Sequence, residues 1–105
     1  MVRVIGFYKW RDGASFDHEY YNKEHMEFTK EKLLPYGLLH LESDQYLSVT
    51  PPQPGDVIAA SNAYFESPEK AQAAIVAVGN DLMSDVPNYT NLSPELKMSF
   101  VTKHF

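Results

Sequence analysis

The residues best suited to chemistry in this chain lie close together on one predicted helix. Tyr21, Glu24, His25 and Phe28 are spaced by three, four and seven residues, which places them on a single helical face. Tyr21 and Phe28 make that face apolar, so we expect it to pack inward and to carry a carboxylate and an imidazole with it. Buried ionisable groups are usually paired, hydrogen-bonded or directed into a polar cavity. This face is therefore either a satisfied part of the core or one wall of a functional pocket.

His25 is the first candidate for catalysis. An imidazole titrates near neutral pH and can act as a general base, a general acid or a hydrogen-bond donor. The alternative is a partly buried histidine that bonds to Tyr21 or to a backbone carbonyl. Glu24 lies at the edge of the apolar face, where solvent or a neighbouring lysine explains it more simply than a catalytic role.

Asp85 is the second candidate. It ends the second predicted helix and directly precedes Val86 and Pro87, where the helix must break. The helix dipole disfavours an acid at this end, so Asp85 needs either a local hydrogen bond or a function. Turn chemistry, in which its carboxylate bonds to the following backbone, is the alternative.

The tyrosines are candidates for holding a ligand. Each combines a large apolar ring with a hydroxyl, a frequent lining for pockets that bind aromatic or carbonyl-bearing molecules. Ordinary core packing explains them equally well. Those concerned are Tyr20, Tyr21, Tyr64 and Tyr89.

Length and composition exclude several classes of protein. The 105 residues suffice for a single domain over 1–105. A net charge of -5 without a basic cluster argues against nucleic acid. The absence of cysteine and of a metal-type histidine pair, together with isolated glycines, leaves no recognisable metal or cofactor site. The chain has neither a membrane-length apolar run nor a signal-peptide pattern, so we expect a soluble cytoplasmic protein.

The predicted elements alternate along the chain in an order that indicates the fold. Strands are expected at 2–10, 37–50, 56–66 and 96–105, and helices at about 17–34 and 68–85. Asp17 or Ser15 can cap the first helix and Ser67 the second. The order β-α-β-β-α-β predicts an α+β, ferredoxin-like fold with a four-stranded antiparallel sheet.

The second face of this sheet leads to a prediction about assembly. Helices cover only one face of such a sheet, and five apolar residues suggest that the other face is also partly apolar. Two copies packed sheet against sheet would bury it, so we expect a homodimer. The five residues are Phe7, Leu39, Leu41, Phe65 and Phe100.

Two segments resemble the EthD family. Residues 16–26 are similar to its signature Phe-Asp-x-x-Tyr-Tyr-x-x-x-His-Met, and residues 85–90 to Asp-x-Pro-Asn-Tyr-Thr. Glu27 departs from the pattern, since many relatives have proline there. The resemblance covers essentially the whole chain and implies a dimeric α+β barrel with a cavity in each subunit. Tyr21, His25, Asp85 and Tyr89 fall within the matched motifs, whereas Glu24 falls in a variable gap.

Three functions follow as hypotheses. In the first, the barrel binds a small apolar or aromatic oxygenated compound and acts as a reductase or an acid/base catalyst. His25 would then move a proton, Asp85 would orient it, and Tyr20, Tyr21 and Tyr89 would hold a carbonyl or hydroxyl. In the second, the protein is a non-catalytic accessory that sequesters a compound for a partner oxygenase. The third, haem handling, would need His25 or His40 as the axial ligand.

Overall fold

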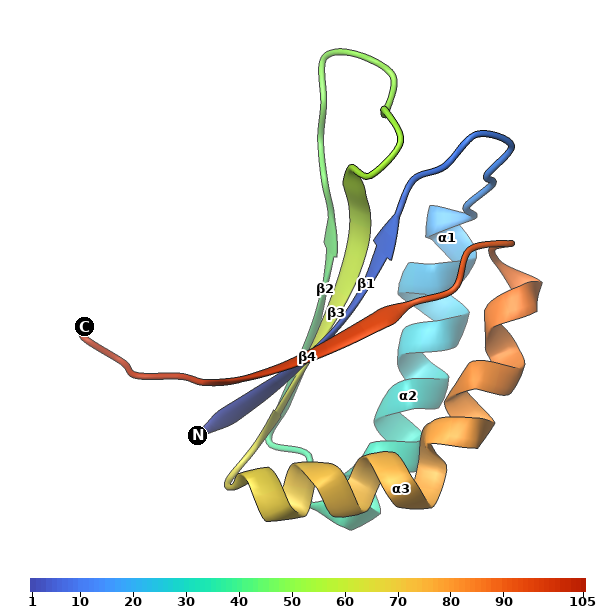
Figure 1. The fold of residues 1–105 in the computed structure, drawn as a ribbon. Coiled ribbons are helices and arrows are strands. Elements are labelled where there is room, and N and C mark those ends of the chain that lie inside the picture. Colours follow the sequence, from blue (N-terminus) through green and yellow to red (C-terminus); the bar gives the residue numbers. More distant parts are fainter.

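Four antiparallel strands form one sheet in the order β2-β3-β1-β4, and the helices cover one of its faces (Figure 1). This is a computed structural model that describes residues 1–105. The predicted α+β fold, with its β-α-β-β-α-β order and antiparallel four-stranded sheet, is confirmed. The strands are β1 (Val2–Lys9), β2 (His40–Gln45), β3 (Val57–Phe65) and β4 (Glu95–Phe100).

The first helical segment is not one regular helix. Asp17 caps it as predicted, because its side chain accepts a hydrogen bond from the Tyr20 amide. A π-helical turn, η1, then separates two α-helical pieces, and Gly37 ends the segment in a left-handed conformation with φ of 92°. The pieces in order are α1 (His18–Tyr20), η1 (Tyr21–His25), α2 (Met26–Leu33) and the 3-10 turn η2 (Leu34–Tyr36).

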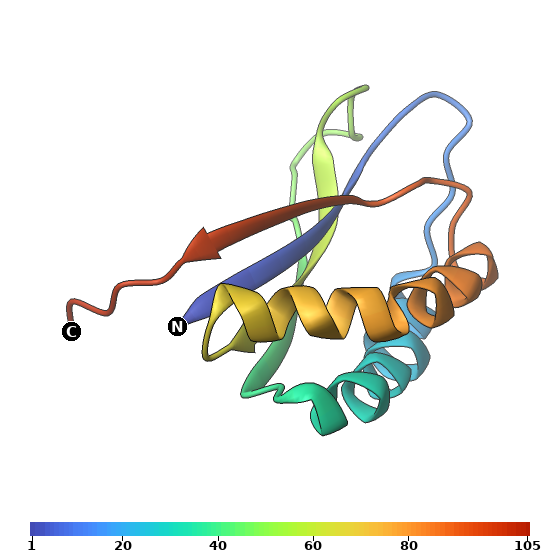
Figure 2. The same cartoon turned by 60° about the horizontal axis from the view of Figure 1, so that its bottom comes forward.

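The second helical segment is α3 (Pro68–Asp85), followed by the 3-10 turn η3 (Val86–Asn88). Ser67 caps α3 by accepting a hydrogen bond from the Lys70 amide, and Pro68 occupies the first turn, where its missing N–H costs nothing. Helix α3 lies beside α2 and against the sheet (Figure 2), and its buried apolar residues belong to one cluster with those of α2 and the sheet. None of the helices combines the length and apolar character needed to cross a lipid bilayer.

Two buried clusters hold the helices on the sheet. One joins the N-terminal half of β1 and the C-terminal half of β3 to α2 and α3, through Val2, Val4, Leu33, Ala63, Phe65, Ala71, Ala74 and Val78. The other lies at the opposite end of β1 and is largely aromatic, with Tyr8, Tyr21, Ile58, Ala59, Val86, Tyr89 and Leu92. The candidate site lies in this second cluster.

The open face of the sheet is more polar than we predicted. Leu41 and Phe100 pair with Ala63 and Val2, so they lie on the helix-covered side together with Phe65. Of the five apolar residues expected there, Phe7 lies on the open side. Its neighbours on that side include Glu42, Asp44, Asn62 and Tyr64, which bond to one another across β2 and β3. The expectation is therefore right for Phe7 and wrong for Leu41, Phe65 and Phe100, and the homodimer stays a prediction.

Two predicted strands are shorter in the structure. β2 ends at Gln45 because the following residues lead into a proline-rich loop that cannot extend a ladder. β4 ends at Phe100, and residues 101–105 continue as an extended tail away from the helices (Figure 1). Phe100 is 79% exposed on this strand.

A candidate acid–base site at the end of an apolar cavity

The π-helical turn places Tyr21 and His25 against the sheet. The Met26 amide donates to the Tyr21 carbonyl five residues earlier, the bond that defines a π turn. Tyr21, His25, Thr29 and Leu33 are buried at successive intervals of four residues. The predicted inward face is therefore confirmed for Tyr21 and His25. Glu24 is exposed, in agreement with its expected place at the solvated edge of that face, and Phe28 is only half-buried.

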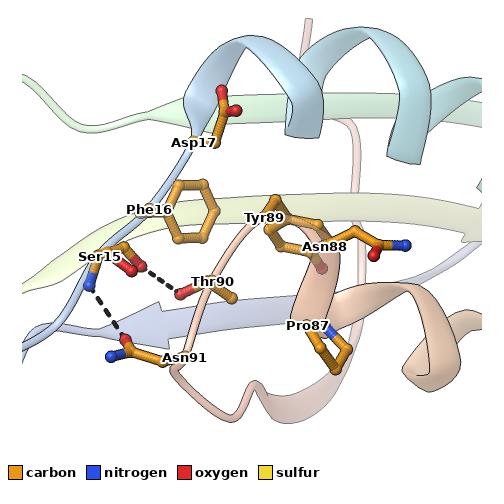
Figure 3. A pocket seen from close by; sticks show the side chains of 8 residues that line it. All are labelled: Ser15, Phe16, Asp17, Pro87, Asn88, Tyr89, Thr90 and Asn91. Atoms are coloured by element: carbon orange, nitrogen blue, oxygen red, sulfur yellow. Dashed lines mark hydrogen bonds between the residues drawn. The ribbon is translucent and has the colours of Figure 1, made fainter.

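The turn after α3 is fastened to the residues that start the first helix (Figure 3). Thr90 and Phe16 form an isolated β-bridge, and the Asp17 amide donates to the Tyr89 carbonyl at 2.8 Å. The Thr90 hydroxyl donates to the Ser15 carbonyl at 2.6 Å, and a shallow polar depression of about 410 Å³ lies over this junction. These bonds join the two motif segments and fix Tyr89 beside His25.

His25 and Asp85 form a partly buried pair. His25 Nδ1 and Asp85 Oδ2 are 2.8 Å apart, and the two side chains are 8% and 15% exposed. The other carboxylate oxygen accepts from the Tyr20 hydroxyl and from the Asn88 amide, each at 2.8 Å. Asp85 is therefore held by three donors, and Tyr20 contacts the carboxylate.

The charges of this pair follow from its surroundings. Burial lowers the pKa of His25, and the adjacent Asp85 carboxylate opposes part of that shift. Burial acts to raise the pKa of Asp85, but the hydrogen bonds from Asn88, His25 and Tyr20 outweigh it and hold that pKa below its ordinary value. At neutral pH the imidazole is neutral and the carboxylate ionised. Nδ1 therefore carries the hydrogen and donates a hydrogen bond to Asp85, whereas Nε2 carries no hydrogen and can accept one.

Two tyrosine hydroxyls extend the hydrogen-bond network from His25 Nε2. The Tyr89 hydroxyl lies 3.3 Å from His25 Nε2, and it forms a short hydrogen bond with the Tyr8 hydroxyl. Burial raises the pKa of Tyr8 to about 12, although the bond to Tyr89 partly offsets it. Burial, followed by the proximity of Tyr8, also raises the pKa of Tyr89. Both phenols are protonated at neutral pH.

A cavity of about 420 Å³ lies between the sheet and the helices α2 and α3. Its walls are mostly apolar and include Val4, Leu33, Phe65, Ile75, Val86 and Leu96. Its polar lining consists of Tyr8, His25, Thr29, Ser61 and Asn80. The Thr29 hydroxyl already donates to the His25 carbonyl at 2.7 Å. The cavity thus offers an apolar volume with a few polar groups, an arrangement typical of small-molecule sites.

The tyrosines proposed from sequence lie behind the cavity wall rather than on it. Tyr21 is 1% exposed and stacks on His25, with ring centroids 5.5 Å apart and planes inclined by 14°. Its hydroxyl is buried and makes no hydrogen bond of ordinary geometry. Burial raises the pKa of Tyr21, and the nearby Ser61 side chain counteracts part of that rise. Tyr20 is hydrogen-bonded to Asp85 and Tyr89 to His25, and neither tyrosine lines the cavity.

Sequence reasoning missed Tyr8, Asn88 and Ser61. A signal for Tyr8 was available, because alternation along β1 places it on the same side as the core residues Val2 and Val4. A signal for Asn88 was also available, because it is the asparagine of the second matched motif, whereas none pointed to Ser61. The structure contains no group of three or more side chains arranged to hold a metal ion.

Comparison with known proteins supports the motif-based prediction. No protein-family model matches the chain, and no curated protein does. The solved structures that resemble it include an EthD-like protein from Ralstonia eutropha JMP134, 27% identical, with a TM-score of 0.82 over 99% of this chain and 94% of that one. They also include an EthD family protein from Bacillus halodurans C-125, 20% identical, with a TM-score of 0.62 over 97% of this chain and 99% of the other. The resemblance of this chain to the EthD family, predicted from its two motifs, is therefore confirmed.

Proposed function

We propose that this protein binds a small apolar molecule bearing an oxygen function in its cavity, and that the His25–Asp85 pair moves a proton to or from that molecule. The observation that carries the proposal is an imidazole at the wall of an apolar cavity, with its Nδ1 2.8 Å from the Asp85 carboxylate. This is the geometry of an oriented general base, in which the carboxylate sets the tautomer and stabilises the imidazolium that forms.

The cavity lining suits a ligand that is largely hydrocarbon. Burial of apolar surface contributes roughly 25 cal/mol per Å², so the apolar walls can supply most of the binding free energy. Ser61 and Asn80 line the cavity, and the Ser61 side chain also lies near the Tyr21 hydroxyl, so the Ser61 hydroxyl and the Asn80 amide can hold a ligand oxygen. An apolar molecule that carries an oxygen could pack against the apolar lining residues and hydrogen-bond to the polar ones.

A bicyclic ketone provides the test. In 2-tetralone the protons next to the carbonyl are acidic enough to be removed by a positioned base, and they are replaced by deuterium when the reaction runs in D2O. We expect the protein to accelerate this exchange, followed by proton NMR, and His25→Gln to abolish the acceleration. His40→Gln is the matched control, since His40 lies on the open face of the sheet and pairs with Glu42 at 3.0 Å. Equal rates for the wild type and for His25→Gln would refute the proposal.

Binding without turnover is the second candidate. Tyr89 occupies Nε2, the one nitrogen of His25 that Asp85 leaves free, and this favours a site that recognises a ligand without reacting with it. Saturable binding of 2-tetralone, measured by calorimetry, together with no exchange above the buffer rate would identify this case.

A further inference from the structure

We propose that the cavity selects ligands carrying a hydroxyl hydrogen, such as phenols and enols, and that Tyr8 is the residue that accepts this hydrogen. The inference rests on the proposed function and makes its ligand class specific. It follows from the direction of the hydrogen bonds that connect Tyr8 to Asp85.

The hydrogen bonds that link Tyr8, Tyr89, His25 and Asp85 form a series, the hydrogen-bond chain. Each of these bonds has only one possible direction when His25 is neutral. The Asp85 carboxylate can only accept, so His25 Nδ1 donates to it and Nε2 must be an acceptor. The Tyr89 hydroxyl therefore donates its single hydrogen to Nε2. Having no second hydrogen, Tyr89 must accept from the Tyr8 hydroxyl. Every donor in the chain thus points away from the cavity and toward Asp85.

Among the hydroxyls of the hydrogen-bond chain, that of Tyr8 is the one that can bond to a ligand. It lines the cavity, whereas Tyr89 does not. Its hydroxyl makes no hydrogen bond other than the one to Tyr89, in which its hydrogen is already used. The Tyr8 oxygen consequently offers the cavity a lone pair and no hydrogen. A ligand hydroxyl can donate to it, whereas an ether or a carbonyl oxygen would meet it lone pair against lone pair.

The same hydrogen-bond chain can carry a proton from the ligand to His25. The ligand O–H bond breaks as its proton passes to the Tyr8 oxygen, while the Tyr8 hydrogen passes to Tyr89 and the Tyr89 hydrogen to His25 Nε2. The ligand becomes an oxyanion, His25 becomes an imidazolium beside Asp85, and both tyrosines end as neutral phenols. No electron is transferred, so no oxidant or reductant is needed.

Two naphthalene derivatives test the selectivity directly. 2-Naphthol carries a hydroxyl hydrogen, and 2-methoxynaphthalene has the same rings and an oxygen at the same position without it. We expect the wild-type protein at neutral pH to bind 2-naphthol about three- to tenfold more tightly, the range for one net hydrogen bond. The extra methyl group of 2-methoxynaphthalene favours that probe in an apolar cavity, so it acts against the expected result. Calorimetric titration of both probes gives the ratio of dissociation constants.

Two variants locate the origin of the preference. Tyr8→Phe keeps the ring and removes the acceptor, so both probes should bind with a ratio near one. Tyr89→Phe leaves the Tyr8 hydrogen without its acceptor and free to turn toward the cavity, so the ratio should fall to one or below. Tyr36→Phe is the matched control because Tyr36 lies outside the cavity at the end of the first helical segment, and it should keep the wild-type ratio.

The possible failures of the two proposals are distinguishable. Equal binding of the two probes by the wild type, or an unchanged preference in Tyr8→Phe, would overturn the selectivity inference and leave the apolar binding site in place. If neither probe bound, both the inference and the proposed function would be refuted. The wild-type comparison needs no substitution, so misfolding of a variant cannot obscure it.

Discussion

Replacing Asp85 with asparagine should reverse the tautomer of His25. The side chain keeps its shape, and one oxygen can still accept from Tyr20 and Asn88. The amide nitrogen would then face His25 Nδ1, where two donors would oppose each other. The imidazole can relieve this conflict by moving its proton from Nδ1 to Nε2. In Asp85→Asn the bare nitrogen is therefore turned away from Tyr89.

The size of the effect follows from the bond that is lost. A hydrogen bond to a charged group contributes about 1.5–3 kcal/mol, and the one between Nδ1 and the carboxylate is 2.8 Å long and largely shielded from water. Holding the productive tautomer without that bond would cost about the same amount. We therefore expect the His25-dependent exchange of 2-tetralone to slow by roughly ten- to 150-fold in Asp85→Asn.

Two measurements check this prediction together. Nitrogen-15 NMR of the histidine rings distinguishes the two tautomers, and the exchange assay reports the rate. The chain of hydroxyls should also reverse, so Tyr8 would now donate and the preference for 2-naphthol over 2-methoxynaphthalene would be lost. A His25 that keeps its proton on Nδ1 in Asp85→Asn, with an undiminished exchange rate, would refute the reasoning.

Three further predictions concern stability and access. Tyr21→Phe removes a buried hydroxyl without a hydrogen bond, so the free energy of unfolding in urea should stay constant or rise by up to about 1 kcal/mol; a clear loss would mean that this hydroxyl bonds to Ser61. Burial lowers the pKa of His25, and also that of His18, so the unfolded chain binds more protons just below the ordinary histidine range. The free energy of unfolding should therefore fall as the pH drops from about 7 to about 5, and His25→Gln should reduce that slope in urea titrations at each pH. Gly79 lines the cavity within α3, and a Cβ there would meet Ile75 at an ordinary 3.7 Å. Gly79→Ala should stabilise the helix by about 0.5–1 kcal/mol, whereas Gly79→Leu should fill the cavity and weaken 2-naphthol binding in calorimetry.

The fold could be predicted because its signals are local. Ser67 and Pro68 mark the start of α3, Gly37 ends the first helical segment, and alternating residues identify β1 and β3. The open face was predicted correctly for Phe7 only, because apolar residues in a strand do not reveal which face they occupy. The side of Phe100 and of Leu41 follows from their pairing partners, Val2 and Ala63.

The candidate site was predictable only in part. Periodicity indicated that Tyr21 and His25 point inward, and the motif resemblance brought in Asp85 and Tyr89. The contact between His25 and Asp85, which are sixty residues apart, depends on how α3 packs beside the first helical segment. Helical spacing carries no information about such a contact. Tyr8 required a third element, since its role exists only where β1 meets the turn that carries Tyr89.

The π-helical turn has a consequence for how such a site can be gained or lost. A π turn is equivalent to one extra residue inserted into an α-helix, and each residue of an α-helix turns the chain by about 100°. Deleting one exposed residue of the turn, such as Lys23, would restore a regular helix and rotate Tyr21 relative to His25. The residues of the sheet, of α3 and of the acid–base pair would all be retained. Tyr21 and His25 would nevertheless no longer lie together beside Asp85 and Tyr89. Insertions and deletions in this segment, more than substitutions, are therefore the changes that would convert the candidate site into a plain packed core.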